Sequence, residues 1–326
     1  MERFPYEKAK LEETSCSFCK SRDFVVLSRE GQDDLPLTSV ICRRCGLIFI
    51  NPRMTREWYD RYYQEEYRAR TVGRGATGKP PDSARLFSQM EEHGRELGTL
   101  VKSYLSLGSG PIVEVGSSLG GVLSGMRAVL DREVVGIEPS GPEADYAKSR
   151  GVSTHKCLME EIDTVAPTLP QFGAVVCTQS LNHLLDPRFF FEWSYRHLTK
   201  DGILVLEVMN FRHQLRRAGR FRNAVKIDHV HMFVPEVLRE FVTAAGFDIL
   251  YFDADEIKSE FELRRVKRAL PTVHMTLIGR RSARPSFAVP VSSGNYRRVR
   301  RSINPLLIYL SYLFSVRLPK FLKSSR

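Results

Sequence analysis

Four cysteines near the start of the sequence have the spacing of a metal site. Cys16 and Cys19 form one Cys-x2-Cys pair, Cys42 and Cys45 form a second, and 22 residues separate the two pairs. Two such pairs supply the four thiolates that tetrahedral zinc takes from a pair of hairpin knuckles. A module this short has too little core to fold without a metal, and four protein ligands leave no open position. We therefore expect a structural Zn²⁺ site.

Two carboxylates and a glycine-rich turn in the middle of the chain have the spacing of a nucleoside site. Residues 112–121 read as an apolar strand, then a turn that opens a helix. Open α/β sheets bind ligands at such turns, where Gly116 and Gly120 let the backbone approach the ligand closely. The turn lacks the glycine spacing that holds a pyrophosphate, and Glu114 places an acid beside the ligand, which suits a cationic cofactor. Glu138 ends the next strand, where a carboxylate can accept both ribose hydroxyls.

These residues need a sheet that brings successive strand ends together. Apolar residues recur at helical spacing over Ser83–Leu107, which Asp82 can cap, and strands then alternate with helices. Such alternation predicts an α/β fold with a doubly wound, mostly parallel sheet. The expected strands are Ile112–Val115, Val134–Ile137, Ala174–Cys177, Ile203–Val208, Asp248–Phe252 and Thr272–Ile278, and the later helices are Val122–Leu130, Pro142–Arg150, Phe189–Leu198 and Glu236–Ala245.

Composition and a glycine- and proline-containing stretch divide the chain into four parts. A chain of 326 residues with 42% hydrophobic content has room for one large core and a small appended module. A glycine-, proline- and threonine-containing stretch at 71–81 indicates a linker. We expect a zinc ribbon over 1–55, with strands at Asp23–Ser28 and Leu47–Ile50, an aromatic connector over 56–82, a catalytic domain over 83–282 and a basic, apolar tail over 283–326.

Charge and cysteine usage bear on compartment and partners. The net charge is +11, but 15 of the 49 basic residues fall within 264–326, where no acidic residue occurs, so the rest of the chain is slightly acidic. A body of this charge makes nucleic acid an unexpected partner. The charged first residues lack the apolar run of a signal peptide, and paired thiols suit a reducing compartment. We therefore expect a cytoplasmic protein.

The strand-and-turn residues resemble the class I S-adenosylmethionine-dependent methyltransferases. Those enzymes carry an acid, x, Gly, x3, Gly motif with a second acid at the end of the next strand, and residues 172–187 and 198–207 resemble their fourth- and fifth-strand motifs. The resemblance implies a seven-stranded Rossmann-like methyltransferase sheet. Where the family usually has Asp and Glu, this chain has Gly173 and Asn182. By resemblance, the S-adenosylmethionine site comprises Glu114, Gly116, Ser117 and Gly120 for the methionine moiety, Glu138 for the ribose, Leu158 at the adenine edge and Gln179 beside the sulfonium.

Methyl transfer to a hydroxyl or C–H acceptor needs a group that removes the acceptor's proton. The segment 228–235 precedes the helix after the fifth strand and resembles the loop that overhangs the acceptor in this family. We expect His229 to be the general base, with Asp228 or His231 as its helper and His183 as a second acceptor-side candidate. The alternative is that each histidine only satisfies backbone groups of the core.

The ribbon and the residues after it resemble a subfamily that includes sugar C-methyltransferases. In that group the ribbon and connector cover the acceptor pocket, so Arg53 and Tyr63 are candidates for acceptor contacts, or for simple packing. Those enzymes have Tyr three positions before the loop histidine, where this chain has Lys226, and carry an extra C-terminal domain. These differences favour O-methylation of a glycosyl or other small-molecule hydroxyl.

The tail combines basic clusters with a short apolar run, Ile303–Val316. This run is too short to span a bilayer, which takes about 20 residues. It suits a helix at the anionic inner surface of a membrane, or a terminal helix docked on the body. Two other functions stay open: an RNA methyltransferase that reads RNA through the zinc module, and a scaffold that keeps the cofactor fold without turnover.

Overall fold

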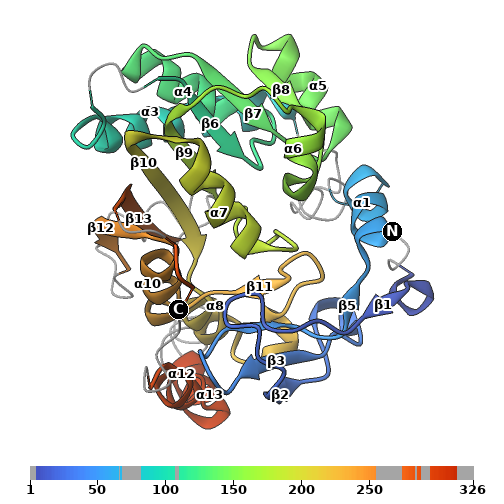
Figure 1. The fold of residues 1–326 in the computed structure, drawn as a ribbon. Coiled ribbons are helices and arrows are strands. Elements are labelled where there is room, and N and C mark those ends of the chain that lie inside the picture. Colours follow the sequence, from blue (N-terminus) through green and yellow to red (C-terminus); the bar gives the residue numbers. More distant parts are fainter. Residues whose placement is uncertain are drawn as a thin grey trace, which may run out of the picture.

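The structure is a computed structural model that describes residues 5–65, 67, 82–106, 110–254, 274–282, 285–287 and 294–313. The expected linker at 71–81 lies outside these residues. Within them, a seven-stranded sheet forms the centre of the body, and helices lie on both sides of it (Figure 1).

The central sheet has the order β12-β13-β10-β9-β6-β7-β8, which confirms the predicted doubly wound fold. Its strands from β10 to β8 pair in parallel, whereas β13 and β12 are antiparallel to their neighbours. The order reverses between β9 and β6, so the carboxyl ends of these strands flank the crevice in which such sheets bind ligands. The strands are β6 (Ile112–Val115), β7 (Val134–Ile137), β8 (Ser153–His155), β9 (Phe172–Thr178), β10 (Leu198–Met209), β12 (Phe247–Asp253) and β13 (His274–Arg281).

Alternate residues of the central strands enter two separate apolar cores. Ile112 packs in the core that includes residues of α3 and α4, while Val113 packs in the core shared with α7, α10 and the ribbon. Because both faces are covered, the strands read as nearly continuous apolar runs. The helices of the body are α3 (Ser83–Lys102), α4 (Gly121–Leu130), α5 (Gly141–Ser149), α6 (Ile162–Val165), α7 (Pro187–His197), α8 (Phe211–Ala218), α9 (Phe221–Ala224) and α10 (Pro235–Ala244), with a 3₁₀ turn, η3, at Met159–Glu161.

Helix α3 is fixed by a cap at its start and by glycines along its length. The Asp82 side chain accepts hydrogen bonds from the amides of Ala84 and Arg85, as the sequence predicted. A Cβ on Gly94 would lie 2.2 Å from the Val122 carbonyl oxygen, so α3 and α4 approach each other at backbone distance. The helix ends at Lys102, before the predicted Leu107, which lies outside the described residues.

The N-terminal ribbon shares a sheet with the body. Strands β2 (Phe24–Ser28), β3 (Ser39–Cys42) and β4 (Ile48–Ile50) pair antiparallel, and β11 (His231–Met232), from the body, pairs with β4. The ribbon lies in the lower half of Figure 1, beside β11. A two-stranded sheet of β1 (Leu11–Glu12) and β5 (Arg53–Met54), the 3₁₀ turns η1 (Tyr6–Lys8) and η2 (Gln32–Asp34) and helix α1 (Arg56–Glu65) complete this part.

The tail forms two helices on the body, α12 (Asn295–Ser302) and α13 (Pro305–Tyr312). They lie at the end of the molecule opposite α3 and α4 (Figure 1). None of the helices within the described ranges is both long and apolar enough to cross a membrane.

Candidate active site and cysteine site

A cavity of about 690 Å³ opens at the carboxyl ends of the central strands. Its wall includes Gly116 and Ser118 after β6, Glu138 after β7 and Gln179 after β9, together with residues of α1, α3 and the 226–229 loop. Cavities of this size take up a drug-sized ligand or cofactor. The topology thus brings Gly116, Glu138 and Gln179 and the predicted loop histidine into one space.

The turn after β6 requires glycine at Gly116. Its φ is +74°, and a Cβ there would lie 2.2 Å from the Ser180 Oγ. Gly120, with φ +79°, is the N-cap of α4 and packs against Ala147, and neither Gly120 nor Ser117 lines the cavity. Gly116 is therefore the glycine at which backbone meets the cavity, while Ser117 and Gly120 shape the turn beneath it.

Glu138 lies at the tip of β7, buried, with its carboxylate anchored by two backbone amides. Its Oε1 accepts from the Ser140 amide and its Oε2 from the Ser118 amide, each at 2.8 Å. Burial, and then the nearby Glu143 carboxylate, raises the pKa of Glu138 to about 8, although these amides oppose the shift. The turn that carries Ser118 and the acid at the next strand tip are thus one hydrogen-bonded unit.

Glu114 is buried in β6, under the cavity rather than on its wall. Its Oε1 accepts a 2.5 Å hydrogen bond from Thr178 Oγ1, and no hydrogen-bond partner for its Oε2 is found among the described residues. Burial raises its pKa to about 8. This carboxyl group supplies negative charge close to the glycine turn when it is ionised.

The remaining predicted cofactor residues, Leu158 and Gln179, both line the cavity. Gln179 has a positive φ of 56°, and its amide donates to the Glu207 carbonyl oxygen at 2.6 Å, which holds this turn at the end of β9. Leu158 precedes the η3 turn and is 7% exposed.

His183, Asp228 and His229 form a compact cluster on the cavity wall. The ring centroids of His183 and His229 are 4.9 Å apart, edge to face, and His183 Nδ1 lies 3.9 Å from Asp228 Oδ2. Burial lowers the pKa of both histidines, that of His229 well below its usual value, and the positive charge of Lys226 acts in the same direction. Both rings are therefore neutral at neutral pH, and the described structure brings these three candidates together.

His231 lies outside this cluster. Its Nδ1 is 3.0 Å from the Leu184 carbonyl oxygen, its Nε2 is 2.9 Å from Ser17 Oγ, and it does not line the cavity. Both ring nitrogens are thus engaged at the contact between body and ribbon. Burial lowers its pKa to about 3, so the ring is neutral.

The aromatic connector after the ribbon reaches the wall of the cavity beside His183. The Tyr63 hydroxyl lies 3.3 Å from His183 Nδ1, and the Tyr59 hydroxyl donates to the Ile227 carbonyl oxygen. Tyr63 lines the cavity, whereas Arg53 does not: it binds Glu12 and donates to the Leu185 carbonyl oxygen.

Sequence reasoning missed a second polar wall of the cavity. His93 Nε2 of α3 lies 2.5 Å from Glu207 Oε2 of β10, and both residues line the cavity. His93 stands on a helix far from β10 in the sequence, and no spacing pattern links the two. The only usable signal was the polar side chain of Glu207 at the end of an apolar strand.

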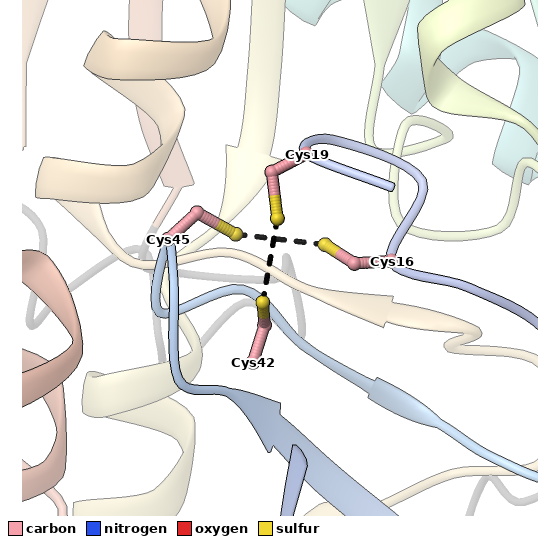
Figure 2. Close-up of side chains that lie close together, drawn as sticks. All are labelled: Cys16, Cys19, Cys42 and Cys45. Carbon is pink, nitrogen blue, oxygen red and sulfur yellow. Dashed lines mark hydrogen bonds between the residues drawn. The ribbon is translucent and has the colours of Figure 1, made fainter. Parts of the chain in front are cut away.

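The four cysteines converge as predicted. Their sulfur atoms point toward one common centre (Figure 2), with Cys16 and Cys45 sulfurs 3.5 Å apart and those of Cys19 and Cys42 3.4 Å apart. Four thiolates at zinc–sulfur distances of about 2.3 Å in a tetrahedron have sulfur separations only slightly longer. The cysteine donor set and its separations therefore fit a zinc ion.

The fold and the cavity define the class of protein. The order of the seven strands is that of Rossmann-like methyltransferases, with the ligand crevice at the strand tips. Residues 59–251 match the family described as a methyltransferase domain. The chain therefore belongs to this family and is an S-adenosylmethionine-dependent methyltransferase.

Parts of this chain are similar to solved methyltransferase structures at low sequence identity. The CcbJ methyltransferase from Streptomyces caelestis is 16% identical, and the match covers 68% of this chain and 98% of that one, with a TM-score of 0.47. Magnesium protoporphyrin IX methyltransferase from Synechocystis PCC 6803 is 11% identical over 70% of this chain and 100% of its own, with a TM-score of 0.48. No curated protein sequence matches the chain significantly.

Proposed function

We propose that this enzyme methylates a hydroxyl group of a small-molecule or glycosyl acceptor, with His229 as general base. The observation that carries the proposal is the position of a buried, neutral histidine on the wall of the cavity that also contains Gly116 and Glu138. A neutral imidazole can take the proton that the acceptor hydroxyl loses.

The neighbours of His229 support this role. His183 packs edge to face against it, and Asp228 lies close to His183, so a proton taken up by the cluster gains a nearby negative charge. Asp228 or His183 suits the helper role better than His231 does, because both nitrogens of His231 are already engaged.

The charge of the cavity bears on the acceptor. Among the described residues its wall includes seven carboxyl groups, of which Glu138, with its raised pKa, is protonated at neutral pH without cofactor, and one lysine, Lys226. Such a wall repels polyanions such as RNA, and it suits a neutral acceptor beside a cationic cofactor. The carboxyl groups are those of Glu96, Glu138, Glu143, Glu160, Glu207, Asp228 and Asp253.

For the cofactor, we propose that Glu138 holds the ribose, the Gly116 turn with Ser117 and Gly120 the methionine moiety, Leu158 the adenine edge and Gln179 the region of the sulfur. When bound, S-adenosylmethionine supplies an electrophilic methyl group on a positively charged sulfur. Glu114 and Glu138, once ionised, favour this positive charge from beneath and beside the turn.

For the cysteines, we propose a structural Zn²⁺ ion bound by Cys16, Cys19, Cys42 and Cys45. Three of the four are fully buried, and four protein donors leave no position for a substrate. Thiolate ligands of this kind, and unpaired Cys157 and Cys177, favour the cytoplasm as the place where the enzyme works.

Methyl transfer from labelled S-adenosylmethionine to free sugars, sugar nucleotides, lipid-linked glycans and RNA tests the acceptor class. We expect a glycosyl or other small hydroxyl compound to be labelled, and exclusive labelling of RNA would overturn the proposal. His229→Ala is expected to lower kcat by about 10²- to 10⁴-fold and leave cofactor affinity unchanged.

His155→Ala is the matched control for the base, because His155 lies on the edge strand β8 and does not line the cavity. We expect its turnover to equal that of the wild type. Unchanged turnover in His229→Ala, with the same acceptor, would reject His229 as the base.

A further inference from the structure

The last described helix docks on the body by one face only. Ile308 of α13 is 2% exposed, and Tyr312 packs against Gly219, where a Cβ would lie 2.8 Å from the tyrosine ring. A narrow apolar groove between Phe221 and Pro305 continues this contact. The docking that the sequence left open is therefore present, but it uses only part of the helix surface.

The other face of α13 presents leucines to solvent. Leu306 is 65% exposed, Leu307 58% and Leu310 40%, and they account for three of the seven exposed large apolar side chains among the described residues. Positions i, i+1 and i+4 of a helix share one side, so these three form a single leucine face. A water-soluble surface rarely gathers apolar side chains without a binding role.

Exposed arginines lie on α9 and α12, the elements next to α13. Arg220 lines the groove beside Pro305, and Arg222 follows it on α9, while Arg301 lies in the last turn of α12, five positions before Leu306. All three are exposed. Helices α12 and α13 together contain four arginines and no acidic residue, so the two helices carry a net positive charge.

We propose that the leucine face, Leu306, Leu307 and Leu310, with the arginines on the neighbouring helices, binds the surface of an anionic phospholipid bilayer. Exposed apolar side chains with arginines on the neighbouring helices match the boundary between anionic headgroups and acyl chains. A nucleic-acid site would use the arginines and leave the leucines without a partner. The inference rests on the cytoplasmic location proposed above, is independent of the methyl-transfer chemistry, and places the enzyme at the inner membrane face.

Co-sedimentation of the full chain with vesicles tests the proposal. We expect binding to phosphatidylcholine vesicles that contain phosphatidylglycerol, much weaker binding to pure phosphatidylcholine, and loss of binding at high salt. Replacing Leu306 and Leu307 together by Ser is expected to weaken binding at least about tenfold. Arg220→Gln with Arg222→Gln is expected to weaken it about 30-fold, at about one kcal/mol for each arginine.

Matched controls come from positions away from α13. Leu250→Ser on β12 removes another exposed leucine, and Arg85→Gln with Arg95→Gln on α3, at the opposite end of the molecule, removes two exposed arginines, so both should bind vesicles as the wild type does. Equal binding by the Leu306/Leu307 double variant, or no vesicle binding at all, would overturn the inference. So would a leucine-dependent dimer, or capture of RNA rather than vesicles. Methyl transfer to a water-soluble acceptor is retained in each of these cases, so the proposed function is tested separately.

Discussion

Binding of S-adenosylmethionine should be coupled to the loss of protons from buried carboxyl groups. Burial raises the pKa of Glu138, and also that of Glu114, to about 8. A carboxylate can accept from both ribose hydroxyls and attracts the cationic sulfur, whereas a protonated carboxyl does neither as well. The cofactor therefore prefers the ionised form, so affinity should be highest above pH 8 and fall as the pH is lowered.

The size of the effect follows from the shift. One pKa unit corresponds to about 1.36 kcal/mol, so at about pH 6.5 ionising Glu138 alone costs about 2 kcal/mol and weakens binding about 30-fold. If Glu114 ionises as well, the slope approaches two decades for each pH unit. Calorimetry at several pH values, in buffers that differ in ionisation enthalpy, measures both the affinity and the number of protons released.

Variants of the acidic pair sharpen this test. Glu138→Gln should remove most of the pH dependence of cofactor affinity and weaken cofactor binding above pH 8. Glu143→Gln should move the pH range over which affinity falls to lower pH, because the Glu143 carboxylate is the second largest cause of the raised pKa of Glu138. An affinity that stays level between about pH 6 and 9, with no proton exchange, would refute the assignment of Glu138 as an ionised ribose ligand.

Further predictions concern stability and the metal. Without cofactor, Glu114 and Glu138 stay protonated in the folded state at pH values well above their usual pKa, whereas the unfolded chain ionises them. The melting temperature should therefore decrease as pH rises from about 5 through 8, which differential scanning fluorimetry would detect. Gly94→Ala should lower the free energy of unfolding, measured by urea titration, by about 1–3 kcal/mol, because the new Cβ would meet the Val122 carbonyl oxygen. Gly98→Ala should lower it less, because its Cβ would lie 3.3 Å from the nearest atom, which belongs to a side chain. His231→Phe should cost about 1–3 kcal/mol at pH 8 and about 2 kcal/mol less at pH 5, because the folded wild-type ring is neutral at both pH values whereas the unfolded chain protonates it at pH 5. Cys42→Ser should remove the bound zinc, measured by elemental analysis, and lower the melting temperature; full zinc content would contradict the cysteine site.

Much of the fold follows from local patterns in the sequence. The apolar runs of β6, β7 and β9 and the Asp82 cap are each encoded within a few residues, and the structure confirms them. Strand β8, Ser153–His155, was missed because a three-residue edge strand has too short a pattern to separate from a loop. Helices α8 and α9 were missed as well, since their many arginines hide the apolar contacts that Phe211 and Leu215 make.

Pairings between distant parts of the chain could not be predicted. The spacing of the cysteines indicates a separate ribbon, yet β11 completes its sheet through two residues of the catalytic half. The pairing of His93 with Glu207 likewise depends on how α3 crosses the sheet, which no local sequence pattern specifies. His231 was chosen as a catalytic candidate for its residue type, but burial and two hydrogen bonds give it a place in the ribbon contact.

These long-range contacts connect the proposed metal site to the wall of the cavity. The ribbon holds the loop that carries His229 through the pairing of β11 with β4, and the connector after the ribbon reaches the Ile227 carbonyl through Tyr59 and His183 through Tyr63. In-line methyl transfer tolerates little displacement of a catalytic base, so with His229 as the proposed base, a loop fixed from two sides would favour a high rate. A zinc ion bound by four cysteines would thus act on catalysis through the rigidity of the ribbon, with no chemical step of its own.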